Sequence, residues 1–183
     1  MKIQYRAVDF RKSEDTVPGA EKWFDFVATV AGAIAAVMII LVFLFRVVTV
    51  EGISMVPTLQ DGDRLILTDV TTRYKRGEIV VISRANDDPL VKRVIAVGGD
   101  TIDLRDGHVY LNGELLEEPY LDQETYDIST GPPEFPLTVP KGKVFVMGDN
   151  RGNSLDSRAY EVGFIDVHQI LGKVVVHLSN GEE

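Results

Sequence analysis

The longest apolar stretch of the chain is long enough to cross a membrane as a helix. The twenty residues from Phe26 to Phe45 carry no charged side chain. At a rise of ~1.5 Å per residue, a helix of this length spans ~30 Å, the thickness of the hydrocarbon core of a bilayer. Trp23 and Phe24 precede it as an interfacial aromatic pair, and Arg46 follows it. The pattern predicts a transmembrane helix over residues 23–46.

A cleaved secretory leader is the alternative interpretation of this stretch. Such a leader has an apolar core of ~7–15 residues and ends in a small-residue cleavage site. The observed stretch is longer, and Phe45-Arg46-Val47-Val48 offers no small-residue site. A retained anchor is therefore favoured.

Short apolar runs rich in β-branched residues replace this pattern beyond residue 46. Gly, Asp and Asn residues separate them, and Val109–Leu111 followed by Asn112-Gly113 is typical of a tight hairpin. The pattern predicts a mainly β fold, irregular and partly closed, for residues 47–183. The expected strands are residues 64–68, 78–82, 91–97, 143–147 and 172–178.

Three segments lie outside these strands and the anchor. Residues 160–170 could hold one short helix. Residues 118–140 are rich in Pro, Asp, Glu and Thr, which is typical of a long surface loop. Residues 1–22 are polar and of mixed charge, which is typical of a disordered tail.

Cysteine content and charge exclude several classes of function. The chain has no cysteine, which excludes thiol nucleophiles, thiolate metal sites and disulfides together. Residues 47–183 contain 13 basic and 23 acidic residues, a formal charge of −10. Such an acidic domain lacks the basic surface that binds nucleic acid, so no nucleic-acid partner is expected.

Basic residues near the two ends of the anchor predict its orientation. Residues 1–22 hold five of them, whereas the twenty residues from Arg46 to Leu65 hold two. Because positive charge is retained on the cytoplasmic side, we expect a single-pass protein of the cell membrane. Residues 1–22 would form a cytoplasmic tail, residues 23–46 the anchor and residues 47–183 an extracytoplasmic domain.

Ser54 is the first candidate for chemistry. It lies in the run Gly52-Ile-Ser-Met-Val-Pro-Thr-Leu59, nine residues beyond the apolar stretch. Glycine and proline bound this run, so a turn could hold the hydroxyl at fixed geometry close to the bilayer surface. A serine is nevertheless a weak nucleophile until a base removes its proton.

Lys92 is a candidate for that base, because it lies in the otherwise apolar run from Pro89 to Val97. Burial disfavours an ammonium group, and lowering its pKa from ~10.4 to ~8 needs roughly 3 kcal/mol, which an apolar pocket supplies. Strand side chains alternate, so Lys92 and Arg93 are expected on opposite faces. The alternative is an ordinary exposed lysine on a strand.

A histidine is the more common base for a serine nucleophile. A Ser-His-Asp site stays open at this point, because triads assemble from residues far apart in sequence. None of the three histidines lies in a motif-like setting: His108, His168 and His177.

The run from Gly148 to Arg158 packs hydroxyl, amide, carboxylate and guanidinium groups into eleven residues after an expected strand. Such a loop could orient a lysine through a hydroxyl, or hold itself rigid through an Asp156–Arg158 pair. The alternatives are a solvated hairpin loop and a calcium loop, although the spacing and the terminal Glu of an EF-hand are missing.

Taken in order, these three motifs resemble those of the type I signal peptidases, the membrane-bound serine–lysine proteases of bacterial secretion. GISMVPTL, with the DGD that follows, is similar to the nucleophile box of that family. LVKRVIAVGGD is similar to the lysine box, and GDNRGNSLDSR to the third loop. The resemblance extends from about Thr49 to Leu178, and one anchor is similar to the compact form of the family.

The resemblance implies a role for each matching residue. Ser54 would be the nucleophile and Lys92 its neutral general base, and Ser154 would orient the lysine through its hydroxyl. The supporting residues would comprise a structural ion pair and two further side chains: Asp156, Arg158, Arg93 and Asp149.

The oxyanion hole is where the chain departs from part of that family. The Ser54 N–H would supply one donor, and in some members a serine two residues earlier supplies the second. This chain has Gly52 at that position. The second donor would then be a backbone group or water, or be missing, and losing one such donor can lower a rate by ~10²–10³.

The implied function is that of a membrane-bound serine endopeptidase that removes N-terminal signal peptides from exported preproteins. Its partners would be those preproteins and membrane lipid, and neither a metal nor an organic cofactor is needed. Two other functions stay open. One is a different membrane-anchored serine–lysine protease, and the other is a non-catalytic, membrane-tethered β-domain that binds a partner.

Overall fold

The computed structural model describes residues 20–71, 73–85, 87–122 and 134–181. The chain divides into two compact units, Met1–Leu41 and Val42–Glu183. The expected N-terminal tail, as far as residue 19, lies outside the described residues, as does the part of the expected surface loop from 123 to 133.

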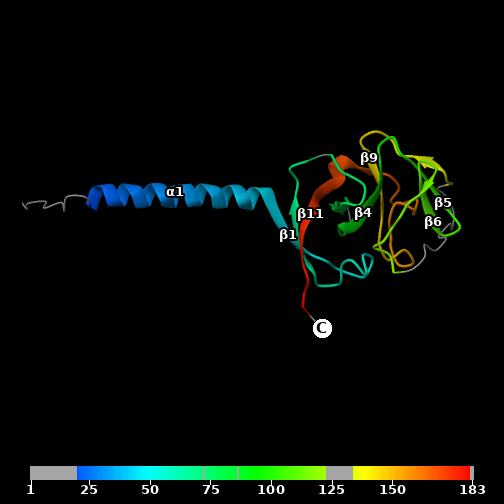
Figure 1. The fold of residues 1–183 in the computed structure, drawn as a ribbon, viewed down its shortest axis with the longest axis horizontal. Helices are drawn as coiled ribbons and strands as arrows, with labels where there is room; N and C mark the ends of the chain where they lie inside the picture. The colour runs from blue at the N-terminus through cyan, green and yellow to red at the C-terminus, as the bar shows by residue number, and fades with distance from the viewer. Residues whose placement is uncertain (1–19, 72, 86, 123–133, 182–183) are drawn as a thin grey trace, which may run out of the picture. The chain divides into compact units, whose positions relative to one another are not determined.

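The N-terminal unit contains most of one apolar helix, α1 (Ala20–Leu44; Figure 1). Within it, Lys22–Val42 is long and apolar enough to cross a membrane, with a mean hydropathy of 2.4. The side chains of this span are exposed throughout. Exposed apolar side chains are unfavourable in water and favourable in hydrocarbon, so the helix fits the expected anchor.

The C-terminal unit contains a seven-stranded sheet in the order β1-β2-β11-β3-β4-β9-β10 (Figure 1). All neighbouring strands in it pair antiparallel. Its strands are β1 (Phe45–Thr49), β2 (Arg64–Thr68), β3 (Ile79–Ile82), β4 (Leu90–Val97), β9 (Lys143–Met147), β10 (Ile165–Asp166) and β11 (Ile170–Leu178).

The helix ends two residues before the boundary expected from the sequence. Phe45 and Arg46 belong to β1, where they pair with Thr68 and Leu67 of β2. Aromatic and β-branched residues favour strands. The backbone of this segment pairs with β2 and does not continue the hydrogen bonds of the helix.

A smaller sheet of four strands has the order β7-β6-β5-β8. The predicted hairpin is confirmed here: Asn112 and Gly113 join β6 to β7 with φ angles of 55° and 89°. A two-residue turn of this kind requires positive φ at both positions. The strands are β5 (Thr101–Arg105), β6 (His108–Leu111), β7 (Glu114–Leu115) and β8 (Leu137–Thr138).

The mainly β prediction is confirmed. Each of the five expected apolar runs forms a strand, as β2, β3, β4, β9 and β11. The expected helix within 160–170 is reduced to one 3-10 turn, Val167–Gln169, which the side chain of Asp166 caps. The strands that the pattern did not predict are short or interrupted by polar residues: β1, β5, β8 and β10.

Strand β4, which carries Lys92 and Arg93, is packed into the core. This strand runs between β3 and β9 in the middle of the larger sheet. Ile95 and Val94 are at most 1% exposed and pack into different core clusters, Ile95 with Phe145 and Val94 with Val146. Shifts of register in β4 and β11 bend the sheet, so it curls into a half-barrel around these clusters.

Candidate active site

Ser54 lies on a compact turn between β1 and β2. The turn is anchored in the core by Met55 and Leu59, each 1% exposed. The Leu59 N–H donates to the Met55 carbonyl at 2.9 Å, and the Val56 N–H donates to the Ile53 carbonyl at 3.2 Å. Two apolar anchors that follow the serine therefore hold its backbone in a turn, as the Gly- and Pro-bounded sequence predicted.

Gly52 allows the chain to enter this turn. Its φ angle is +87°, which is strained for residues with a side chain. Its N–H donates to the Asp61 carboxylate at 2.7 Å, so that group is not available to an oxyanion. The Ser54 N–H, by contrast, has no hydrogen-bond acceptor among the described residues.

Lys92 meets Ser54 from β4. Its Nζ lies 2.7 Å from Ser54 Oγ and donates to the Val91 carbonyl at 3.0 Å. The residue is 2% exposed, so the alternative of an ordinary solvated strand lysine does not describe it. The two residues that sequence reasoning paired are in direct contact.

The environment of Lys92 favours its uncharged form. Burial lowers the pKa of the amine from 10.5 to about 8. Within this net shift, the charges of Asp156 and Asp149 oppose the lowering of the pKa, and those of Arg158 and Arg84 contribute to it. Near pH 8 about half of the molecules would therefore carry a neutral Lys92, whose nitrogen can accept the Ser54 proton.

Asp156 and Arg158 form the buried ion pair that the third motif predicted. Arg158 donates to both carboxylate oxygens of Asp156, at 2.8 Å each, and the Gly148 N–H donates to it at 2.9 Å. Burial acts to raise the pKa of Asp156, but the hydrogen bonds and charge of Arg158 outweigh it, so the net shift is downward. The loop is thus held rigid through a permanent carboxylate.

Ser154 lies beside the Ser54–Lys92 pair without a hydrogen bond to Lys92. Its hydroxyl donates to Asp156 at 2.7 Å, and no Ser154–Lys92 bond is present among the described residues. A Cβ atom on Gly148 would overlap both Ser154 Oγ and the Ser54 carbonyl oxygen. The hydroxyl is therefore close to the Ser54 backbone, and its expected orienting role stays a prediction.

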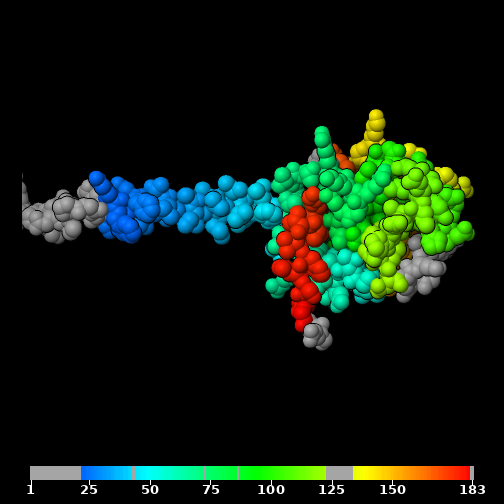
Figure 2. Space-filling view, viewed as in Figure 1, coloured from blue at the N-terminus to red at the C-terminus, as the bar shows by residue number. Residues whose placement is uncertain are grey.

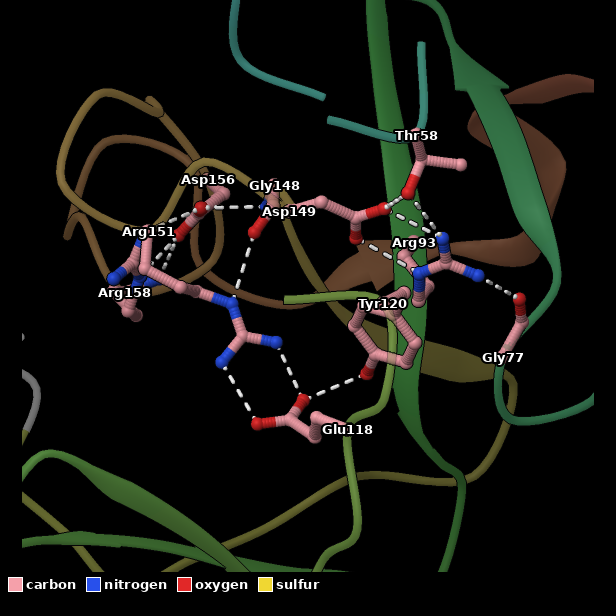
Figure 3. A network of polar contacts seen from close by, with 10 residues as sticks. All are labelled: Thr58, Gly77, Arg93, Glu118, Tyr120, Gly148, Asp149, Arg151, Asp156 and Arg158. Carbon is pink, nitrogen blue, oxygen red and sulfur yellow. Dashed lines mark hydrogen bonds and ion pairs between the residues drawn. The ribbon is translucent and has the colours of Figure 1, made fainter. Parts of the chain in front are cut away.

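Arg93, the neighbour of Lys92, points to the other face and joins a network that reaches the Ser54 turn (Figure 3). Its Nε donates to Asp149 at 2.8 Å, and its Nη1 donates to the Gly77 carbonyl at 2.9 Å. Thr58, four residues after Ser54, donates its hydroxyl to the same carboxylate. Both supporting residues, Arg93 and Asp149, are thus part of the scaffold that holds the turn.

Other residues of this scaffold were not predicted from the sequence. Asn150 holds the Ser54 turn in place, since its N–H donates to the Ser54 carbonyl at 3.0 Å and its Nδ2 donates to the Ile53 carbonyl at 3.1 Å. Glu118 and Tyr120 lie at the start of the expected surface loop, yet Figure 3 shows them packed beside Arg93 and Arg151. Apart from the bond between Tyr120 and Glu118, their partners lie far away in the sequence, so local patterns could not indicate these roles.

The histidines lie elsewhere. His108 is in β6 and His168 in the 3-10 turn, and none of the three is hydrogen-bonded to Ser54 in the described part of the chain. His177 Nε2 lies 2.6 Å from the buried Asp63 carboxylate. That contact secures the outer half of β11, which lies open on the surface (red in Figure 2). The Ser-His-Asp alternative therefore has no geometric support.

A groove with a volume of about 400 Å³ has Ser54 and Lys92 in its lining. Two chain segments supply much of its lining, residues 48–51 and residues 88–92. Charged side chains stand among the lining residues: Glu51, Arg84 and Asp88. Among the described residues, no cluster of three His, Cys, Asp or Glu side chains is placed to bind a metal.

Comparison with known proteins adds to this geometry. The sequence model of the family described as "Signal peptidase, peptidase S26" matches residues 23–178. The signal peptidase I of Bacillus licheniformis is 40% identical over 159 residues, 81% of this chain and 84% of that protein. The signal peptidase I T of Bacillus subtilis (strain 168) is 42% identical over 150 residues, 76% of this chain and 77% of that protein. A crystal structure of a signal peptidase I from Enterococcus faecalis V583 is 33% identical, covers 57% of this chain and 97% of its own, and superimposes with a TM-score of 0.46.

Proposed function

Because the chain belongs to the signal peptidase family, peptidase S26, we propose that it is a membrane-anchored serine endopeptidase that removes N-terminal signal peptides from exported preproteins. The observation that carries the proposal is the 2.7 Å contact between Ser54 Oγ and Lys92 Nζ in an open groove. A hydroxyl next to an uncharged amine can be deprotonated as it attacks a carbonyl carbon.

Lys92 acts as the base in both halves of the reaction. Ser54 Oγ attacks the scissile carbonyl while its proton moves to Lys92 Nζ, and the resulting ammonium then protonates the leaving amine. The mature protein departs, and the signal peptide stays bound to Ser54 as an ester. A water molecule that has lost its proton to Lys92 hydrolyses this ester and frees the serine.

The oxyanion formed in each half needs hydrogen-bond donors. The Ser54 N–H is suited to this role, since it has no acceptor among the described residues. The Gly52 N–H is excluded by its bond to Asp61. The second donor is then water or another backbone group, or it is missing.

The substrate segment binds in extended form. β1 is an edge strand of the larger sheet, and its C-terminal end lines the groove together with residues 88–92. An edge of this kind can pair with the backbone of an extended peptide. Signal peptides end in small side chains at the first and third positions before the cut, and the groove accepts these side chains.

The topology of the chain follows the positive-inside rule. Residues 1–22 form the cytoplasmic tail, residues 23–44 the single span, and residues 45–183 the catalytic domain outside the cytoplasm, at the cell membrane. Enzyme and preprotein are then confined to one bilayer. That confinement raises their effective concentration, so a weak affinity for the substrate suffices.

The test is incubation of the detergent-solubilised full chain with one preprotein, followed by N-terminal sequencing of the product. We expect one cut after a small residue. Ser54→Ala and Lys92→Ala should each abolish it, whereas Lys141→Ala, at an exposed loop position, should cleave like the wild type. An uncleaved preprotein with the wild type, or normal cleavage by either dyad variant, would overturn the proposal.

A further inference from the structure

We propose that the segment Glu118–Tyr120 positions the Ser54–Lys92 pair, by closing a ring of contacts around Arg93 and Asp149 (Figure 3). None of the ring side chains belongs to the groove lining, so these residues act on the reaction through others. The inference rests on the proposed function, whose dyad it serves.

The first half of the ring runs through Arg93. Its guanidinium carbon lies 3.9 Å from the centroid of the Tyr120 ring, as a cation over an aromatic face. The same guanidinium donates to Asp149 through Nε at 2.8 Å. Since the Arg93 side chain is 10% exposed and that of Asp149 is fully buried, these contacts are shielded from water and are stronger than surface pairs.

The second half returns from Tyr120 to the same loop. The Tyr120 hydroxyl donates to Glu118 at 2.7 Å, and Arg151 donates to the other oxygen of Glu118 at 2.9 Å. Arg151 also donates through Nε to the Gly148 carbonyl at 2.9 Å. Gly148 directly precedes Asp149, which accepts the hydrogen bond from Arg93. The contacts therefore form a closed ring.

The ring connects the two halves of the dyad. Arg93 is next to Lys92 on β4, while Asp149 accepts a hydrogen bond from Thr58 of the nucleophile turn. Asn150, the next residue, donates its N–H to the Ser54 carbonyl at 3.0 Å. A shift of the Gly148–Arg151 segment would therefore change the distance between Ser54 Oγ and Lys92 Nζ, and an error of ~1 Å in such a position can lower a rate ~10²-fold.

The experiment removes the aromatic ring of Tyr120 and compares this variant with a matched control variant. Tyr120→Ala eliminates the stack on Arg93, and Tyr120→Phe restores the ring without the hydroxyl. Tyr110→Ala is the control, because Arg105 lies 4.0 Å from the centroid of the Tyr110 ring in the smaller sheet, outside the site. Each full-length variant is assayed in detergent for kcat and KM on a preprotein and for its thermal midpoint.

We expect Tyr120→Ala to lower kcat by about 10- to 100-fold with KM within about twofold of the wild type. Tyr120→Phe should recover at least about a third of the wild-type kcat. Tyr110→Ala should keep full turnover at a similar loss in thermal midpoint. Should Tyr120→Ala not fold, Tyr120→Leu takes its place, since it keeps apolar volume and lacks the aromatic face.

Two results would overturn the inference. One is a kcat for Tyr120→Ala, or for its Leu replacement, within twofold of the wild type. The other is an equal loss of kcat in Tyr120→Ala and Tyr110→Ala, which would mean a general loss of folded protein. A second measurement distinguishes failure of this inference from failure of the proposed function. Labelling of Ser54 by a serine-directed acylating inhibitor measures the reactivity of the Ser54–Lys92 pair without any preprotein. That labelling should slow by the same factor in Tyr120→Ala.

Discussion

Replacing Lys92 with methionine should stabilise the folded domain at neutral pH while it abolishes cleavage. Burial lowers the pKa of Lys92 from 10.5 to about 8. One pKa unit corresponds to ~1.4 kcal/mol, so keeping this group buried below pH 8 lowers the free energy of unfolding by about 3 kcal/mol. Methionine has a similar length and carries no charge, so it removes this penalty.

The pH dependence of the gain has a definite sign. Between about pH 8 and 10.5 Lys92 is charged in the unfolded chain and neutral in the folded one. The unfolded state then binds more protons, so the stability of the wild type rises with pH across this window. Lys92→Met lacks this titration, and its advantage should be about 2 kcal/mol smaller at pH 10 than at pH 7.

Hydrogen bonds from Lys92 to Ser54 and to the Val91 carbonyl are lost in the variant. Their loss offsets about 1–2 kcal/mol of the gain, but it largely cancels when the two pH values are compared. The assay is urea unfolding of the full chain in detergent at pH 7 and pH 10, followed by circular dichroism. Lys141→Met, at an exposed position, is the control. A difference between Lys92→Met and the wild type that stays constant from pH 7 to pH 10 would refute the reasoning.

Three further predictions follow from the same contacts. Acylation of Ser54 should slow about tenfold for each pH unit below about 8, because only neutral Lys92 accepts the proton; a rate that is flat from pH 6 to 9 would contradict this. Gly148→Ala should lower kcat at least about tenfold, since its Cβ would overlap Ser154 Oγ and the Ser54 carbonyl oxygen, and steady-state kinetics on folded protein measures it. Arg158→Met should lower the free energy of unfolding by about 3–5 kcal/mol, because it leaves the Asp156 carboxylate buried without its cation; a urea titration that shows less than about 1 kcal/mol would count against it.

The sequence could predict the dyad because local rules place both residues. Glycine and proline on either side of Ser54 indicate a turn, and the apolar neighbours of Lys92 indicate a buried strand. Alternation along that strand also separates Lys92 from Arg93, as observed. The contact between Ser54 and Lys92 is not local, however, and only the resemblance to a known family supplied it.

The residues that escaped prediction depend on tertiary packing. Glu118 and Tyr120 lie in a stretch rich in proline and acidic residues, whose composition is typical of a solvated loop. Their burial follows from two arginines that lie 27 and 33 positions away in the sequence, Arg93 and Arg151. Likewise β10 is two residues long, and a pattern of period two cannot be recognised in so few positions.

Covalent labelling of Ser54 is the most direct test of the central claim, that a neutral Lys92 activates this serine. The full chain and its Lys92→Ala variant are incubated at pH 8 with a serine-directed acylating inhibitor, and the adduct is located by mass spectrometry of peptides. We expect one stoichiometric adduct on Ser54 of the wild type and none on the variant. Equal labelling of Ser54 in both proteins, or an adduct on another serine, would contradict it.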